Sequence, residues 1–527
     1  MVPAPSLDSS SLSRARTYLE RRVAIDTRTL AVFRVFVGLL VIADLLLRAR
    51  NFPFYYTNDG VVPRWLAMEQ TADYAFSFYY LTTDPYLIAG LFVLQGLIAV
   101  QLIVGYKTRI ASILTFLFVV SLDHHNPLVL SYADTLFRLL LFWAMFLPLG
   151  ERWSIDAVHR GREPRASITS FASALILGQM VYMYVMNGYH KSKDELWTSG
   201  DATPLIMGLD NTTFLLGEFM RNFPTLLQLG GLTWYYMLLF AWLLILLPGR
   251  ARMAFAGMFL VAHASFAVTV RIGAFPYVAI AGVLLFLQAQ FWDDTARLAR
   301  RLGIDLDRLR AQLTDLEDLA ARVPDYRFDS DRQRQVKDGL YTFTIVVVVV
   351  TIAMVAGISA LQLGGVVDDD IGHDQEVERV ASSLSIDQPD WSVFAPTPRT
   401  TDRYYVFPAE TADGEYVDVY NERPLTYDRP GDELQKQYDT YRERFFMGDI
   451  RRANDGDPEP ELLAEHLCTT WEEEHGDELV RINMYLISED VTMETIDDHE
   501  DRDRSIRLLS KHGCGDNEPE RIDPPED

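Results

Sequence analysis

Two lysines at the end of a long apolar stretch are the residues best placed in this sequence for acid–base chemistry. Lys191 and Lys193 lie in a segment, residues 189–202, that is predicted to sit at the mouth of a membrane-embedded region. The chain holds only six lysines, against 42 arginines. Arginine keeps its proton at ordinary pH, whereas burial lowers the pKa of a lysine amine until it can accept a proton. The competing interpretation is that both lysines lie at the membrane interface with their charged ends in water.

Ionisable side chains inside other apolar stretches form a second group of candidates, because a charge within a bilayer needs a partner or a task. Asp134 lies four residues before Arg138, and Asp44 lies four residues before Arg48, so each pair can meet on one helix face. Such pairs either order a helix bundle or support catalysis. His263 stands alone in its apolar stretch, which is typical of a hydrogen-bonded core residue as well as of a catalyst.

The run Asp123-His124-His125 contains residue types that bind metals. Neighbouring residues of a helix point about 100° apart, so two adjacent histidines do not share one ion easily. The multi-histidine motifs of membrane di-iron enzymes are absent from the sequence. The sequence therefore predicts no metal site.

These candidates are positioned by nine apolar stretches, each close to the ~20 residues needed to cross a bilayer. We therefore expect an all-α polytopic membrane helix bundle of about nine spans, followed by a C-terminal extracytoplasmic α+β domain. The predicted spans are residues 29–49, 86–105, 108–123, 131–149, 169–190, 231–248, 252–271, 274–292 and 341–363.

Basic residues gather in alternate links between the predicted spans, including the N-terminal segment 1–28 and the link 293–340. Short links rich in arginine and lysine stay in the cytoplasm. This pattern predicts a cytoplasmic N-terminus, a C-terminal domain outside the cell membrane, and Lys191 at the outer face. Leucines at helical spacing in the link 293–340 predict a cytoplasmic amphipathic helical segment.

The net charge of −25 is concentrated beyond residue 365, in the predicted outer part. An acidic surface of this kind does not suit nucleic acid, which requires a basic face. Acidic residues combined with arginine in place of lysine are typical of proteins adapted to high salt, where charges are strongly screened.

The outer part is predicted to contain a linker over residues 364–390, an α+β domain over residues 391–514 and a disordered acidic tail over residues 515–527. Cys468 and Cys514 either form a disulfide, which an extracellular setting permits, or remain separate thiols.

Within the α+β domain, residues 403–407 and 415–420 alternate around Asp413-Gly414, which predicts a hairpin. Helices are expected near residues 431–453 and 459–475, and a further strand over residues 479–487. The domain contains no catalytic motif, so we expect it to cover the outer face of the bundle.

Several short motifs occur in an order and spacing that match a known family. They are Arg34 within residues 30–48, Gly60–Arg64, Asn126-Pro127, Leu147–Gly150 with Trp153–Asp156, and Gly188–Lys191 with Trp197 and Gly200. With these motifs the first 290 residues resemble the HTTM (horizontally transferred transmembrane) family. The composition is similar to that of haloarchaeal members. That family is related to vitamin K-dependent γ-glutamyl carboxylase. The resemblance covers the first eight predicted spans, residues 29–292, and the predicted ninth span, residues 341–363, lies beyond it.

The carboxylase uses a lysine base to deprotonate reduced vitamin K, and oxygenation then gives a base strong enough to remove a proton from a glutamate γ-carbon before carbon dioxide adds. The resemblance implies that Lys191 corresponds to this lysine, with Lys193 as the substitute. It also implies a membrane quinol as cofactor. The family's activating Asn-His pair falls near Ala133-Asp134 here, so that feature departs from the carboxylase.

The sequence thus predicts a multi-pass protein of the cell membrane, with the lipid bilayer and a lipid-soluble quinone or a peptide substrate as partners. Lys191 would be the base, and Asp134, Arg138 and His263 would support it. One alternative is a non-enzymatic membrane anchor or receptor, which predicts a filled bundle. Another is a transporter, which favours an internal repeat. The sequence does not fix the oligomeric state.

Overall fold

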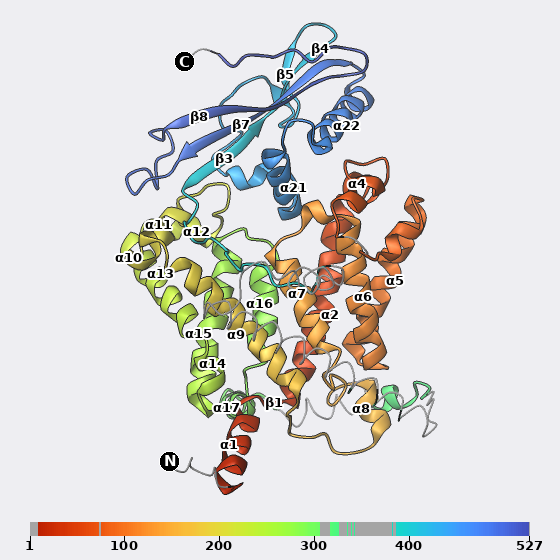
Figure 1. Cartoon of the computed structure of the whole chain (residues 1–527), viewed down its shortest axis with the longest axis vertical. Coiled ribbons are helices and arrows are strands. Elements are labelled where there is room, and N and C mark those ends of the chain that lie inside the picture. The colour runs from red at the N-terminus through yellow and green to blue at the C-terminus, as the bar shows by residue number, and fades with distance from the viewer. Residues whose placement is uncertain are drawn as a thin grey trace, which may run out of the picture.

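The computed structural model describes residues 9–72, 75–305, 317–325 and 386–525, together with four isolated positions between residues 335 and 382. A mostly helical part, residues 9–305, carries a C-terminal domain built around a sheet at one end of the long axis (Figure 1). The N-terminal helix lies at the opposite end.

The helical part combines long helices with short connecting ones. In chain order they are α1 (Ser9–Arg22), α2 (Thr27–Arg50), α3 (Phe52–Tyr56), α4 (Arg64–Glu69), η1 (Phe78–Leu81), α5 (Pro85–Val104), α6 (Thr108–His125), η2 (Pro127–Val129), α7 (Tyr132–Ala144), α8 (Ile155–Arg160), α9 (Phe171–Lys191), α10 (Glu195–Ser199), α11 (Ala202–Met207), α12 (Leu216–Met220), α13 (Pro224–Leu239), α14 (Leu243–Leu246), α15 (Gly249–Thr269), α16 (Phe275–Leu284) and α17 (Ala289–Arg301). Two short strands, β1 (Ile25–Asp26) and β2 (Ser167–Ile168), pair beside α2.

Helix α9 carries Lys191, and a capping box fixes where this helix begins. The Ser170 Oγ accepts a hydrogen bond from the Ser173 N–H, and the Ser173 Oγ accepts one from the Ser170 N–H. The helix then runs for 21 residues, so Lys191 is its last residue. At 3.6 residues per turn, Tyr184, Asn187 and Lys191 share one face of α9.

By length and composition, three helices in the described part of the chain could cross a membrane, namely α2, α5 and α15. Helices α16 and α17 meet at 99° and would together make a fourth candidate. Helix α9 has 21 residues but is not among these candidates, and several of the other predicted spans are shorter than the ~20 residues that a crossing requires. Helix α7 has 13 residues and α13 has 16, and the stretch 231–248 is divided between α13 and α14. The predicted ninth span, residues 341–363, falls almost wholly outside the described residues.

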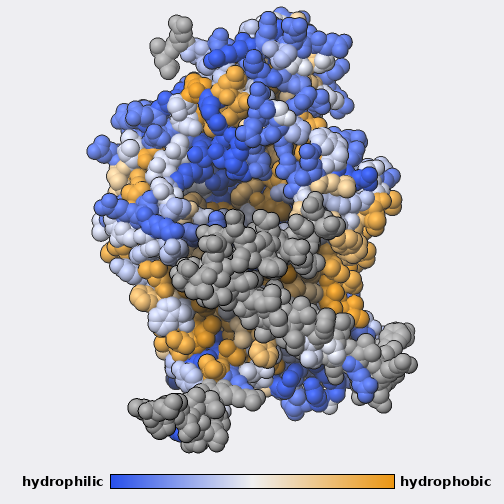
Figure 2. Space-filling view, in the orientation of Figure 1, coloured by the Kyte–Doolittle hydropathy of each residue, from blue (hydrophilic) through white to orange (hydrophobic). Residues whose placement is uncertain are grey.

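The surface of the helical part agrees with a lipid environment. Hydrophobic residues gather on its flanks, whereas hydrophilic residues cover the C-terminal domain and the opposite end (Figure 2). On α5, Leu87 and Leu97 each expose 61% of their surface. Water disfavours exposed apolar side chains of this size, whereas lipid accepts them. Helix α7 is the opposite case, since nearly all of its residues are buried at the centre of the bundle.

The C-terminal domain is an antiparallel sheet with two helices packed against it (Figure 1). The long strand β7 pairs with β8 along one edge and with β3 and β4 in succession along the other. Its elements are β3 (Thr401–Val406), β4 (Pro408–Thr411), β5 (Tyr416–Asp418), β6 (Arg423–Pro424), η3 (Leu434–Gln437), α21 (Tyr441–Arg452), α22 (Pro458–His475), β7 (Leu479–Asp490) and β8 (Arg504–Gly513).

The sheet differs from the sequence prediction in its pairing. The turn at Asp413-Gly414 joins β4 to β5, whereas residues 401–406 form β3, which pairs with β7. The predicted first strand of the hairpin, residues 403–407, therefore lies in β3 up to Val406, and the strand that pairs with β5 across the turn is β4 instead. Cys468 and Cys514 form a disulfide that ties α22 to the end of β8. Residues 515–525, for which composition favoured disorder, lie beside β7, where the Asn483 side chain donates to the Glu520 carbonyl at 2.9 Å.

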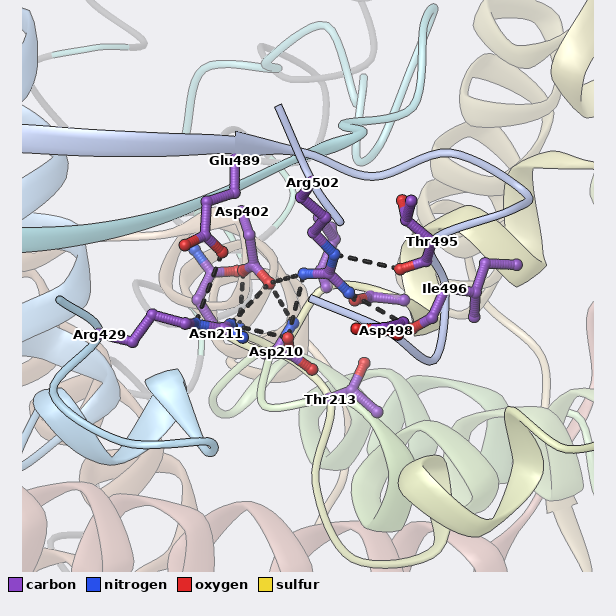
Figure 3. Close-up of polar contacts among 12 residues, drawn as sticks. Asp210, Asn211, Thr213, Asp402, Arg429, Glu489, Thr495, Ile496, Asp498 and Arg502 are labelled. Carbon is purple, nitrogen blue, oxygen red and sulfur yellow. Dashed lines mark hydrogen bonds and ion pairs between the residues drawn. The ribbon is translucent and has the colours of Figure 1, made fainter. Parts of the chain in front are cut away.

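A buried ion cluster fastens the C-terminal domain to the loop after α11 (Figure 3). The Asp402 carboxylate accepts hydrogen bonds from the backbone N–H groups of Asp210 at 2.6 Å and Asn211 at 2.9 Å. The Arg502 guanidinium lies 3.0 Å from both aspartates, and Arg429 lies 2.8 Å from Asp210. Burial and the neighbouring Asp210 raise the pKa of Asp402. The two parts of the chain therefore meet through an ion cluster as well as through apolar contacts.

Candidate functional site

Lys191 is buried at the end of α9, with only 2% of its surface exposed. Its Nζ donates hydrogen bonds to the backbone carbonyl oxygens of Val393 at 2.9 Å and Phe394 at 3.3 Å. Among the described residues, no carboxylate forms an ion pair with this amine. The amine is therefore removed from water, and its polar neighbours are uncharged.

Trp197 of α10 completes the surroundings of the amine. The Lys191 Nζ lies 3.4 Å from the centroid of the Trp197 ring, where the ring face is electron-rich. The Trp197 Nε1 donates to the Phe394 carbonyl at 2.9 Å, so that carbonyl accepts from both side chains. The lysine and the tryptophan thus hold the same peptide group from two directions.

The peptide groups that bind Lys191 belong to residues 391–394, which we call the strap. The Asn187 Nδ2 donates to the carbonyls of Trp391 at 2.7 Å and Val393 at 3.0 Å. Trp391 is fully buried, and both Trp391 and Phe394 have a φ of 52°, which lies in the left-handed region. That conformation costs about 1–2 kcal/mol for each non-glycine residue. The contacts of Asn187 and Lys191 therefore hold the strap in a conformation that it would not adopt alone.

A cavity of about 870 Å³ opens beside Lys191. Its walls come from α9, α11, α13, α15 and the strap, and almost all of its lining is apolar. Cavities of this size hold small organic molecules or cofactors. Residues on its walls include Met183, Tyr184, Asn187, Lys191, Trp197, Trp234, Met237, Phe266, Phe275 and Phe394.

His263 of α15 lies behind the cavity wall. It is fully buried, and its Nε2 lies 2.8 Å from the Tyr184 hydroxyl, which belongs to a residue that lines the cavity. Its Nδ1 has no hydrogen-bond partner among the described residues. The histidine thus reaches the cavity through Tyr184, about two helix turns from Lys191 along α9.

Asp134 and Arg138 lie in a different place, in a buried cluster of three aspartates and three arginines. Neither residue lines the cavity beside Lys191. The expected Asp44–Arg48 pair is present, with 2.8 Å between the Asp44 Oδ2 and the Arg48 Nε. The cluster consists of Asp44, Asp123, Asp134, Arg48, Arg138 and Arg442.

The expected pairing of Asp134 with Arg138 is replaced by pairs that reach further along the chain. The Arg138 Nη1 lies 2.7 Å from the Asp123 Oδ2, whereas the Asp134 Oδ1 lies 2.9 Å from the Arg442 Nη2. Arg442 comes from α21 of the C-terminal domain and also contacts Asp44. Asp134 is held in place by Ser131, whose N–H and hydroxyl both donate to its Oδ2. Because its acids and bases are equal in number, the cluster is electrically balanced.

The helical part contains the whole of the matched family region. The family model of the HTTM domain matches residues 23–292, which includes Lys191, Asp134, Arg138 and His263. The chain belongs to the HTTM family. No curated protein and no solved structure matches the chain.

In this HTTM protein the two lysines of the opening motif have different surroundings. Lys193 is exposed, and its Nζ lies 4.3 Å from the centroid of the Tyr189 ring. Lys191, two residues earlier on the chain, is turned inward and buried. Of the two candidates, only Lys191 lines the cavity.

Sequence reasoning did not select Asn187, Tyr184 or the strap. The spacing of Tyr184, Asn187 and Lys191 was a usable signal, because three polar residues at positions i, i+3 and i+7 of an apolar helix mark one polar stripe. The strap had no such signal, since Val393 and Phe394 contribute backbone oxygens, which every residue possesses.

Proposed function

We propose that this protein is a membrane enzyme in which Lys191 acts as a general base on a lipid-soluble quinol bound in the cavity. The observation that carries the proposal is a buried amine, without an acidic partner among the described residues, on the wall of a large apolar cavity. The likeness of the motif around Lys191 to the lysine motif of the carboxylase supports the same role. The chemistry is therefore proposed to begin with removal of a quinol hydroxyl proton.

The hydrogen bonds of the amine suit this role. A neutral amine has two N–H donors and one lone pair, and Val393 and Phe394 supply two carbonyl acceptors. With both donors engaged, the lone pair is left to accept a proton. Desolvation disfavours a charged amine, so such a site favours the neutral form that a base requires.

The remaining candidates receive roles according to their positions. His263 would polarise the Tyr184 hydroxyl at the cavity wall, because the two are hydrogen bonded. Asp134 and Arg138 would act at a distance. They would hold the helices in place through the buried cluster that contains Asp123 and Arg442. As the resemblance to the carboxylase suggests, the quinol would supply, on reaction with molecular oxygen, a base strong enough to take a proton from a peptide substrate before carbon dioxide adds.

The proposed setting is the cell membrane, crossed by about nine spans, with a cytoplasmic N-terminus. The C-terminal domain and Lys191 would then face the outside. The disulfide between Cys468 and Cys514 supports an oxidising compartment for that domain. The acidic composition supports a protein adapted to high salt.

The anchor or receptor alternative predicted a filled bundle without a hollow near Lys191. A cavity of about 870 Å³ at that position favours the enzyme proposal instead.

The test is quinol-dependent oxygen uptake by the purified protein, together with incorporation of labelled carbon dioxide into peptide. We expect activity in the wild type and a loss of about 100-fold or more in Lys191→Ala, as general-base removal typically produces. Lys193→Ala is the matched control, because it removes an exposed amine two residues away. Equal activity of both variants would remove the lysine base from the mechanism.

A further inference from the structure

A second hollow, of about 270 Å³, lies between the helical part and the C-terminal domain. Five arginines line it, which is unusual in a chain with a net charge of −25. Its walls also carry the rings of Tyr132, Tyr405 and Tyr438. The arginines are Arg399, Arg403, Arg444, Arg451 and Arg452. We call this hollow the arginine pocket.

Four of these five guanidinium groups have no acidic partner in the described part of the chain, the exception being Arg452, which pairs with Asp449. Arg399 and Arg444 bind uncharged oxygens instead. The Arg399 Nη2 donates to the Asn211 side chain at 2.5 Å, and the Arg444 Nη1 donates to the Arg271 carbonyl at 3.1 Å. The pocket therefore carries an excess of positive charge.

The carboxylate of Asp402, which acts electrostatically on two of the arginines, is already engaged. Asp402 influences both Arg399 and Arg444, but its oxygens accept from two backbone N–H groups and from Arg502. The Arg399 Nε is buried and has no hydrogen-bond partner among the described residues. A buried donor without an acceptor is costly and is rare in native proteins. The pocket thus contains an unused donor as well as unbalanced charge.

The arginines also oppose one another. Burial, and then the Arg444 guanidinium, lower the pKa of Arg399 to about 10. Burial and the Arg399 guanidinium likewise lower the pKa of Arg403. An anion bound among these arginines would raise both pKa values again, because it would supply a negative charge that offsets their mutual repulsion.

The geometry points to a binding site for a phosphate group in the arginine pocket. A phosphate monoester carries close to two negative charges and three terminal oxygens, which suits several arginines better than a single carboxylate does. The pocket shares Ile272, Phe275, Val393 and Phe394 with the cavity beside Lys191, so the strap separates the two hollows. This site is independent of the proposed lysine chemistry and would remain if that proposal failed.

The experiment is a calorimetric titration of the full-length protein in neutral detergent, at fixed ionic strength. Inorganic phosphate tests a free ion, and dihexanoyl phosphatidic acid tests a lipid headgroup, with phosphate-free dihexanoylglycerol as its control. Binding of either phosphate compound supports the site, and the compound that binds shows whether the ligand is a free phosphate ion or the headgroup of a lipid. Binding of neither, or tighter binding of succinate than of both, would overturn the proposal.

Two variants locate the binding to the pocket. Arg403→Gln and Arg451→Gln remove guanidinium groups that make no ion pair among the described residues, so their folding should be retained. Each is expected to weaken phosphate binding about tenfold or more, as loss of a charged hydrogen bond does. Arg521→Gln is the matched control, because Arg521 is 55% exposed and does not line the pocket. Unchanged affinity in both pocket variants would contradict the assignment.

Discussion

Lys191 and Arg442 are both buried basic side chains at the boundary between the helical part and the C-terminal domain, yet their surroundings differ. Arg442 has two aspartates within ion-pair distance, in a cluster whose charges balance. Lys191 has two backbone carbonyls and a tryptophan ring. A balanced buried cluster is what a fold needs to hold two parts together. A buried amine without an acidic partner has no such charge balance, and this is the feature on which the proposed role of Lys191 as a base depends.

The Arg442→Met variant should produce the largest effect on stability. It leaves Asp44 and Asp134 with one partner fewer in a buried place, and loss of one member of a buried pair typically costs about 3–5 kcal/mol. Thermal unfolding of the full chain measures the change. Arg50→Met is the control, because Arg50 pairs with Asp439 at the surface and should cost less than about 1 kcal/mol. Similar losses in the two variants would remove the distinction between the cluster and a surface pair.

Asn187→Leu should have an intermediate effect that falls on the strap. It removes two hydrogen bonds from the carbonyls of Trp391 and Val393, for an expected cost of about 1–3 kcal/mol. Hydrogen exchange should rise in residues 391–394 before it rises in the sheet. Exchange that rises uniformly over the chain would show that the strap is not held by this side chain.

Lys191→Met should have the smallest effect on stability. The variant keeps most of the length of the side chain and no longer buries an amine. The Val393 and Phe394 carbonyls each lose one donor but keep a second, Asn187 and Trp197 respectively, so we expect a net change of no more than about 1 kcal/mol. Thermal unfolding beside Arg442→Met gives the comparison directly. A loss of thermal stability as large as that of Arg442→Met would make Lys191 a structural residue. The difference between Lys191 and Arg442 would then disappear.

Local features of the fold could be predicted from the sequence, because their determinants are neighbours along the chain. The i,i+4 pair of Asp44 and Arg48 is of this kind, as are the β4–β5 turn at Asp413-Gly414 and the two helices of the C-terminal domain. The disulfide was one of two open interpretations, since the chain has only two cysteines.

The contacts that join the two parts of the chain could not be predicted. Arg442 lies 308 residues from Asp134, and the strap carbonyls lie more than 200 residues from Lys191. An arginine with a distant partner looks the same in a sequence as an arginine in water. The predicted partner of β3 was wrong for the same reason. The turn at Asp413-Gly414 suggested a local partner, whereas β3 pairs with β7, which lies far along the chain.

The most direct test of the account is whether Lys191 is shielded from water while Lys193 is not. The full-length protein would be treated briefly with a charged N-hydroxysulfosuccinimide ester, which is too polar to enter an apolar cavity, and the two amines would be compared by peptide mass spectrometry. We predict rapid modification of Lys193 and protection of Lys191, with protection lost in Asn187→Leu. Equal modification of both lysines in the wild type would contradict the account.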